Sequence, residues 1–156
     1  MLPNRKNIRL NSYDYCKARK YFVTICCEGG TSYFGKIEHS QMFVNKLGEM
    51  IESQLIILPK YFTNVCIDCY QIMPNHIHGI IEIKSKRTGI NLSKIIGQYK
   101  SITTNLYIDG VHKYNWPRFR KRFWQRGFYE RIIRNDRELK NTRIYIKQNP
   151  INNQSL

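Results

Sequence analysis

The chain has 156 residues, of which 42% are hydrophobic and 13% aromatic, and this composition excludes a disordered protein. Its 26 Lys and Arg residues outnumber its 11 Asp and Glu residues, and the net charge of +15 predicts a polyanionic partner. No segment approaches the ~18 apolar residues of a membrane span, and residues 1–6 lack the apolar centre of a signal peptide. We therefore expect one cytoplasmic domain over residues 1–156, with no membrane partner.

The first part of the chain predicts a basic arm followed by a hairpin. Residues 1–20 are polar and basic, and arms of this composition often lie along a nucleic-acid backbone, so Arg5 and Arg9 are predicted nucleic-acid contacts. Residues 21–27 are rich in aromatic and β-branched side chains, which predicts a strand. Residues 33–37 predict a short return strand that completes the hairpin.

The middle of the chain predicts a helix, a second hairpin and a second helix. Apolar residues recur at helical spacing from Phe43 until Pro59 closes the segment. Residues 65–72 and 76–83 predict two strands joined by a tight connection. Asn91 is the expected N-cap of the second helix, whose apolar residues form one stripe.

Between Asp109 and Glu130 the chain carries six basic residues and no acidic residue, interleaved with aromatic rings. Cations for phosphates beside flat rings for unstacked bases are typical of a single-stranded nucleic-acid surface, although some rings, including Phe123, are expected in the core. We predict a basic aromatic loop over residues 108–122 and then a strand over residues 122–129. The predicted nucleic-acid contacts here are Lys113, Trp116, Arg118, Arg120, Lys121, Arg122 and Arg126.

A last helix is predicted from Asp136 until Pro150, because proline does not continue a helix. Without the short return strand, the order of elements is strand, helix, strand, strand, helix, strand, followed by this extra helix. The order predicts an α+β fold of the ferredoxin-like (RRM-like) class, with an antiparallel sheet and both core helices on one face.

His76 and His78 stand one residue apart in the second strand of the second hairpin. Because strand side chains alternate between faces, both imidazoles point to one side. Neutral imidazole nitrogens are common ligands of divalent ions, so the pair is a candidate metal site. The alternative is two surface histidines on an amphipathic strand. The face that carries them is expected to point toward the final helix or toward a ligand.

The last helix carries a stripe formed by Glu138, Thr142, Tyr145 and Asn149, which recur at helical spacing. Spacing alone favours packing, because a tyrosine on a helix is often half-buried and an asparagine before proline is often a cap.

Three ordered motifs carry a resemblance to a known family. They are residues 73–79 (MPNHIHG), 124–134 (WQRGFYERIIR) and 145–150 (YIKQNP). With residues 2–6 and 21–25, they resemble the single-tyrosine HUH transposases and, among these, the IS200-like REP-associated tyrosine transposases. The resemblance covers nearly the whole chain.

The resemblance implies that His76 and His78 hold a divalent metal, Mg²⁺ or Mn²⁺, and that Tyr145 is the nucleophile. It further implies that Asn149 completes the metal site, with Gln148 as the alternative, because the family has either residue type there. The implied activity is metal-assisted nicking and rejoining of single-stranded DNA near hairpins or palindromic repeats, through a 5′-phosphotyrosine intermediate. The implied enzyme acts as a monomer or a homodimer.

Three other functions stay open at this point. A ferredoxin-like sheet with basic and aromatic residues also describes non-catalytic single-stranded nucleic-acid-binding modules. A replication initiator or relaxase would use the same metal and tyrosine, although the chain is small and has no helicase or primase segment. A metal hydrolase would use the histidines and a metal-bound water, and it would form no covalent adduct.

Overall fold

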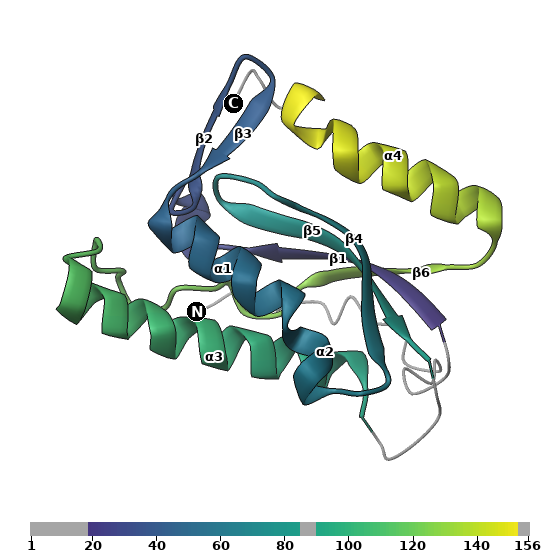
Figure 1. Ribbon diagram of the computed structural model, residues 1–156, viewed down its shortest axis with the longest axis horizontal. Coiled ribbons are helices and arrows are strands. Elements are labelled where there is room, and N and C mark those ends of the chain that lie inside the picture. Colours follow the sequence, from purple (N-terminus) through teal and green to yellow (C-terminus); the bar gives the residue numbers. More distant parts are fainter. Residues whose placement is uncertain (1–18, 85–89, 153–156) are drawn as a thin grey trace, which may run out of the picture.

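A four-stranded antiparallel sheet forms the centre of the computed structural model, which describes residues 19–84 and 90–152 (Figure 1). The spatial order is β4-β5-β1-β6, and the strands are β1 (Arg19–Cys26), β4 (Val65–Ile72), β5 (His76–Ile83) and β6 (Tyr129–Ile133). Two helices connect these strands, α1 (Lys46–Ile56) and α3 (Leu92–Tyr114), and each follows an asparagine whose side chain caps it. This arrangement confirms the predicted ferredoxin-like fold.

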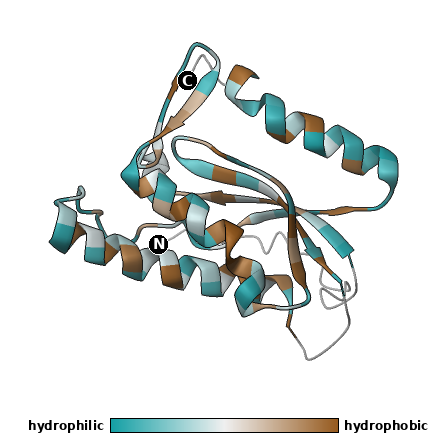
Figure 2. Ribbon diagram, in the orientation of Figure 1, coloured by the Kyte–Doolittle hydropathy of each residue, from teal (hydrophilic) through white to brown (hydrophobic). Residues whose placement is uncertain are grey.

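The two faces of the sheet carry separate hydrophobic clusters. Tyr21 and Ile25 of β1 point to one face, where they pack with residues of α1 and α3. Phe22 points to the other face and packs with Ile146 of α4 (Asp136–Asn152). Figure 1 shows α1 and α3 on one side of the sheet and α4 on the other, and in Figure 2 α4 is mainly hydrophilic with short apolar segments. The histidine face of the sheet therefore points toward the final helix.

The predicted hairpin between the first strand and residues 33–37 is wrong. Instead, β2 (Gly35–Glu38) pairs with β3 (Gln41–Val44) in a separate two-stranded sheet, and α1 begins only after β3. The turn residues His39 and Ser40 both have positive φ, which is typical of a two-residue type I′ turn. Asn-Gly or Asp-Gly usually supplies this turn, so neither residue signals it in the sequence.

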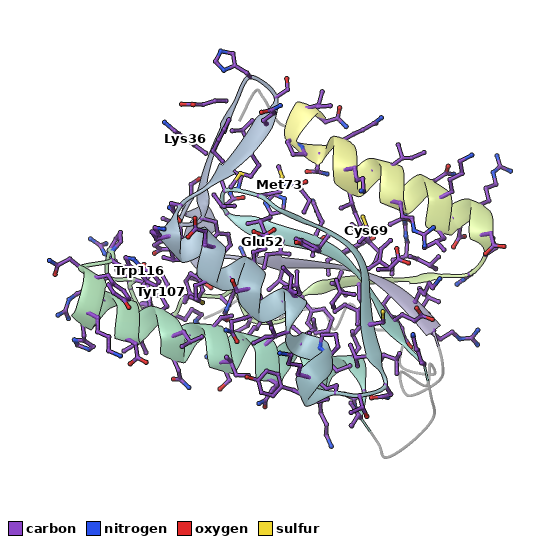
Figure 3. All side chains as sticks on the ribbon, viewed as in Figure 1. Lys36, Glu52, Cys69, Met73, Tyr107 and Trp116 are labelled. Carbon is purple, nitrogen blue, oxygen red and sulfur yellow. The ribbon has the colours of Figure 1, made fainter. Side chains whose placement is uncertain are left out.

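Helix α3 is longer than predicted, so residues 108–114 belong to a helix and not to a loop. The helix ends where Asn115 adopts a left-handed backbone conformation with a φ of 57°. Trp116 then folds back onto Gly110, where a Cβ atom would lie 2.0 Å from the indole ring. Figure 3 shows Trp116 beside Tyr107 at this end of α3, and their ring centroids lie 6.0 Å apart. Gly110 therefore permits close packing and does not break the helix.

The predicted strand over residues 122–129 is also wrong. Phe123 and Trp124 are buried in the core, and β6 begins only at the end of this segment. The Lys100 ammonium donates hydrogen bonds to two of the segment's backbone carbonyls, at 2.8 and 2.5 Å. Lys100 of α3 thus holds residues 122–129 in place, although the aromatic composition of this segment is typical of a strand.

Two prolines lie within helices where the sequence predicts a stop. Pro59 belongs to the one-turn helix α2 (Leu58–Tyr61), and α4 continues past Pro150 to Asn152. Proline lacks an N–H donor and clashes with the preceding turn, which costs little for Pro59 in the first turn of α2, whereas Pro150 interrupts the hydrogen bonds of the last turn of α4. None of the helices in the described ranges is both long enough and apolar enough to cross a membrane.

Candidate active site

His76 and His78 lie on β5 with their rings on the same face of the sheet, as predicted. Their ring centroids are 4.6 Å apart, and Nε2 of His76 lies 3.1 Å from Nε2 of His78. Strand β5 is paired with β1 on one side and β4 on the other, which fixes the backbone beneath both rings. The two Nε2 atoms therefore face a common point.

Asn75, just before β5, determines which nitrogen of the first ring is protonated. Its Nδ2 donates a hydrogen bond to the Gly30 carbonyl (3.1 Å), and its Oδ1 lies 2.6 Å from Nδ1 of His76. An amide oxygen only accepts, so the hydrogen of a neutral His76 ring lies on Nδ1 and the lone pair on Nε2. Nδ1 of His78 lies 2.9 Å from the Thr24 hydroxyl. Each ring is thus held through Nδ1, which leaves Nε2 directed at the other histidine.

Burial keeps both imidazoles neutral at physiological pH. It lowers the pKa of His76, and burial together with the neighbouring His76 lowers the pKa of His78 to about 4. A hydrogen bond with Asn149 favours protonation of His78 but does not outweigh these effects. The neutral ring is the form that binds a metal ion.

Helix α4 brings Tyr145 and Asn149 to the histidines. The Tyr145 ring centroid lies 5.6 Å from that of His78 and 5.9 Å from that of Phe22, and Tyr145 is 49% exposed. Asn149 is buried and hydrogen-bonds with His78, whereas Gln148 is exposed. The four residues that the resemblance singles out therefore come together, and Asn149 faces the site in preference to Gln148.

The separation of the two paired histidine nitrogens fits a divalent metal ion. Two nitrogens bound at a right angle to one ion, each at about 2.1 Å, lie about 3.0 Å apart. The observed separation of the two Nε2 atoms is 3.1 Å. Among residues 19–84 and 90–152, no group of three or more His, Cys, Asp or Glu side chains could hold a metal. Beside the two histidines, the buried amide of Asn149, which hydrogen-bonds with His78, is a further side chain that could contribute a ligand.

An ion pair fastens α4 to the sheet close to Tyr145. Nε and Nη2 of Arg143 donate hydrogen bonds to the two carboxylate oxygens of Asp68 on β4, at 2.7 and 2.6 Å. The hydrogen bond to Arg143 is the main cause of a lowered pKa of Asp68. Sequence reasoning missed this pair because 75 residues separate its members.

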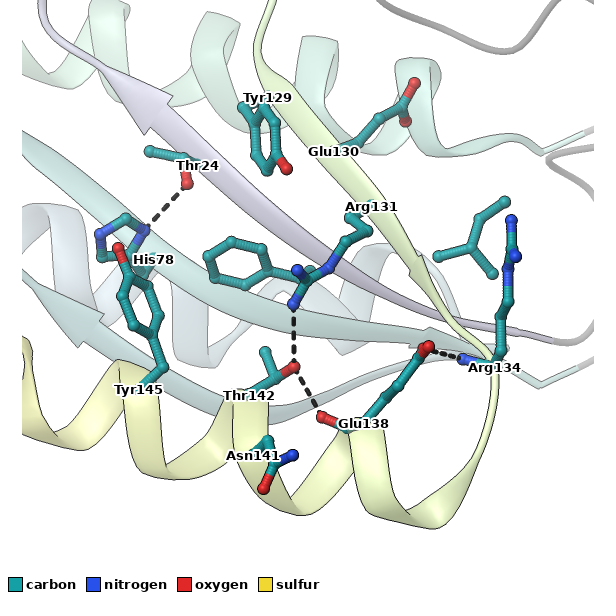
Figure 4. Close-up of a pocket in the computed structure, with 12 residues that line it drawn as sticks. Thr24, His78, Tyr129, Glu130, Arg131, Arg134, Glu138, Asn141, Thr142 and Tyr145 are labelled. Carbon is teal, nitrogen blue, oxygen red and sulfur yellow. Dashed lines mark hydrogen bonds between the residues drawn. The ribbon is translucent and has the colours of Figure 1, made fainter.

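A cleft of about 950 Å³ opens beside Tyr145, between β6 and α4 (Figure 4). Arg131 of β6 points into it, and its Nη2 donates a hydrogen bond to Oγ1 of Thr142 at 3.3 Å. Sequence reasoning assigned Arg131 no role, although it lies in one of the three motifs. Because side chains alternate between the faces of a strand, the sequence of β6 predicts that Arg131 lies on the same face as Tyr129.

The predicted nucleic-acid contacts are distributed over several places. Arg5 and Arg9 lie outside the described residues. Lys121, Arg122 and Arg126 line a groove of about 710 Å³ between α3 and residues 119–128. Three further cations are exposed outside the lining of that groove, and these are Lys113, Arg118 and Arg120. Trp116 is half-buried because it packs against α3.

Comparisons with known proteins agree with this geometry. A family model described as transposase IS200-like matches residues 37–149, which contain the paired histidines, Tyr145 and Asn149. An uncharacterized protein of Haemophilus influenzae is 33% identical in an alignment 172 positions long, which covers 96% of this chain and 90% of that protein. A second protein of that organism, named as a candidate REP-associated tyrosine transposase, is 26% identical over 141 residues, covering 88% of this chain and 73% of that protein.

A solved structure shows the same fold. It is a REP-associated tyrosine transposase bound to a REP hairpin, and it matches with a TM-score of 0.69 and 19% identity over 95% of this chain and 76% of that chain. The family model spans most of the chain and includes every residue of the candidate site that the resemblance singles out. The chain therefore belongs to the IS200-like transposase family.

Proposed function

We propose that the protein nicks and rejoins single-stranded DNA, with Tyr145 as the nucleophile. The observation that carries this proposal is the contact between the rings of Tyr145 and His78, whose centroids lie 5.6 Å apart. A tyrosine hydroxyl beside two neutral imidazoles that face a common point suits covalent phosphate-ester chemistry. Membership of a transposase family supports an enzyme of DNA transposition.

In the proposed reaction, the Tyr145 oxygen attacks the phosphorus of a DNA phosphodiester. A bond forms between the phenol oxygen and phosphorus, and the bond from phosphorus to the 3′-oxygen of the upstream nucleotide breaks. The phenol loses its proton and the departing oxygen gains one, so the products are a 5′-phosphotyrosine bond and a free 3′-hydroxyl. The number of phosphate-ester bonds is unchanged, so the 3′-hydroxyl of another DNA end can reverse the step without ATP.

We assign the metal site to His76, His78 and Asn149. A divalent ion bound there would supply Lewis-acid stabilisation of the phosphate oxygens. Two imidazoles and an amide oxygen suit Mn²⁺ better than Mg²⁺, which prefers oxygen ligands. The chain itself supplies orientation, because Asn75 and Thr24 hold the two rings through their Nδ1 atoms.

The proposed substrate is single-stranded DNA next to a hairpin. The net charge of +15 supports a nucleic-acid partner, and the related solved structure contains a REP hairpin. The basic groove between α3 and residues 119–128 is a candidate surface for the phosphates of the stem. Tyr145 lies beside the histidines of its own chain, which supports action as a monomer, with a homodimer as the alternative.

Covalent capture tests the proposal. The protein is incubated with Mn²⁺ and a 3′-labelled single strand that contains a hairpin from the DNA flanking its gene, and products are separated on a denaturing gel. We expect a DNA–protein adduct with the native chain and none with Tyr145→Phe, which lacks the attacking oxygen but keeps the ring against His78. Tyr114→Phe removes the hydroxyl of another exposed tyrosine, at 69% exposure, and should leave the adduct intact.

The hydrolase and the binding module give different gels, whereas a replication initiator or relaxase would form the same adduct. Cleavage without an adduct in the native chain would favour the metal hydrolase. Binding without cleavage, with Mn²⁺ and in a parallel reaction with Mg²⁺, would favour the non-catalytic binding module. An adduct that persists in Tyr145→Phe would show that another residue is the nucleophile.

Replacing Asn75 with alanine is expected to weaken Mn²⁺ binding by about 10- to 100-fold, the usual cost of losing a residue that orients a metal ligand. The physical reason is that His76 then loses the acceptor that keeps its lone pair on Nε2. Isothermal titration with Mn²⁺ measures the change. Asn105→Ala, at an exposed position of α3, is the matched control and should bind Mn²⁺ normally. Native affinity in Asn75→Ala would refute the orienting role.

A further inference from the structure

The cleft beside Tyr145 has a basic and aromatic wall on β6. Side chains alternate along this strand, so Tyr129 and Arg131 share the face that points toward α4. In the strand register, Tyr129 lies opposite Thr24 and Arg131 lies opposite Phe22 of β1. Tyr145 lines the same cleft from α4 (Figure 4). The proposed nucleophile therefore opens onto a surface that carries the Arg131 cation and the Tyr129 ring.

The Arg131 guanidinium is held in place by the protein itself. Its Cζ lies 5.6 Å from the centroid of the Phe22 ring, and its Nη2 donates to Thr142. The same Phe22 ring contacts Tyr145 edge-on, with 5.9 Å between centroids. Thr142 takes one of the five N–H donors of the guanidinium, and the planar fork of the others matches the oxygens of a phosphate. Arg131 is thus an oriented cation next to the proposed nucleophile.

Tyr129 supplies an exposed ring on the same wall. It is 49% exposed and packs edge-on against Phe22, with 6.0 Å between ring centroids. An edge-on contact leaves a face of the Tyr129 ring available for stacking. Exposed rings beside cations are the usual means by which proteins hold the unstacked bases of a single strand.

Two carboxylates also line the cleft, and both are occupied or covered. Oε2 of Glu138 accepts a hydrogen bond from the backbone N–H of Arg134 at 2.8 Å, at the start of α4. The carboxylate oxygens of Glu130 are buried. The Glu130 oxygens are therefore not exposed in the cleft, and one oxygen of Glu138 is engaged at the start of α4.

We propose that this cleft is the path of the scissile single strand, with Arg131 binding a backbone phosphate and Tyr129 stacking an adjacent base. The inference rests on the proposed function for the chemistry at Tyr145, but binding of the strand requires no reaction. The Phe22 ring contacts both Tyr145 and Arg131, so it sets how far the bound phosphate lies from the nucleophile.

The test measures equilibrium binding of a short oligonucleotide without a hairpin, over a series of salt concentrations. All variants are made in the Tyr145→Phe protein, so that no covalent product forms. Arg131→Gln should weaken binding about tenfold and reduce the slope of log affinity against log salt by about 0.7, the value for one phosphate of a single strand. Tyr129→Ala should weaken binding about tenfold with no change of slope, and Tyr129→Phe should bind normally.

Two further variants keep the result decisive. Arg137→Gln removes an exposed charge of α4 that does not line the cleft, and it should leave affinity and slope unchanged. Arg131→Met keeps apolar packing over Phe22, and it should reduce the slope of log affinity against log salt by the same amount as Arg131→Gln. Unfolding temperatures are recorded for both variants.

Native slopes in both Arg131 variants would overturn the inference, and so would an equal loss in Arg137→Gln. Weaker binding in the Arg131 variants, combined with no adduct in the native protein, would keep the strand path and refute the proposed reaction. The two failures are therefore distinguishable.

Discussion

Replacing His78 with alanine is expected to weaken Mn²⁺ binding by at least about 100-fold and to abolish adduct formation at micromolar metal. Loss of a residue that merely orients a ligand costs about 10- to 100-fold in affinity, and loss of the ligand itself costs more. The variant also removes the charge stabilisation that the proposed reaction requires. Calorimetric titration with Mn²⁺ measures the first effect, and a denaturing gel with labelled DNA measures the second.

The matched control for this variant is His112→Ala, which removes an exposed imidazole near the end of α3 and should change neither quantity. The His78 ring also stacks on Phe22, with 5.5 Å between centroids, so the unfolding temperature must be recorded for each protein. Partial recovery of the adduct at millimolar Mn²⁺ would identify metal binding as the defect. Native affinity for Mn²⁺ in His78→Ala would contradict the assignment of this histidine as a ligand.

Only part of the candidate site could be predicted from local patterns. Alternation along a strand was enough to put His76 and His78 on one face, whereas the roles of Tyr145 and Asn149 came from the family resemblance, because helical spacing alone favoured packing. The choice between Asn149 and Gln148 could not be made in this way, because it depends on which side of α4 docks on the sheet. Thr24 was missed for a related reason, since 54 residues separate it from the ring that it contacts.

The misassigned elements of the fold depend on contacts that local propensity does not report. Residues 122–129 have the composition of a strand, yet they form only an isolated bridge between Trp124 and Cys27, and the ammonium of Lys100 binds the carbonyls of Gln125 and Gly127. The basic aromatic loop was predicted to begin at residue 108, but α3 continues to Tyr114, and the missing side chain of Gly110 admits Trp116. Both errors arise from tertiary packing that overrides the preference of a short segment.

A bulge in β4 has a similar effect at Asp68. The pairing with β5 shifts between Ile67 and Cys69, so Asp68 is an extra residue with no partner in the strand register. Before the bulge, Ile67 packs on the side of α1 and α3, and after it Cys69 packs under α4. Regular alternation would put these two side chains on one face. The bulge therefore adapts β4 to the docking of α4, and its residue provides the carboxylate that Arg143 binds.

Removing either member of this ion pair, with Asp68→Ala or Arg143→Ala, is expected to slow adduct formation by about 10- to 100-fold at saturating Mn²⁺. Tyr145 is two residues from Arg143 on the same helix, and a displacement of about 1 Å at a reacting group can cost a factor of about 100. The two-point hydrogen bond restricts both sliding and rotation of α4 on the sheet. Single-turnover rates from denaturing gels measure the effect.

Exchanging the charges, with Asp68→Arg and Arg143→Asp combined, separates docking of the helix from loss of a charge. If the pair acts by holding α4, the exchanged protein should recover part of the rate lost in each single variant, and the double-mutant cycle should show coupling.

Because the pKa of Asp68 is lowered by Arg143, the native pair is fully formed at neutral pH and is lost only as the pH falls below about 4. Lys46→Ala breaks an exposed pair with Glu49 on α1 and should leave the rate unchanged. Native rates in both single variants would show that apolar packing around Ile146 suffices to position Tyr145.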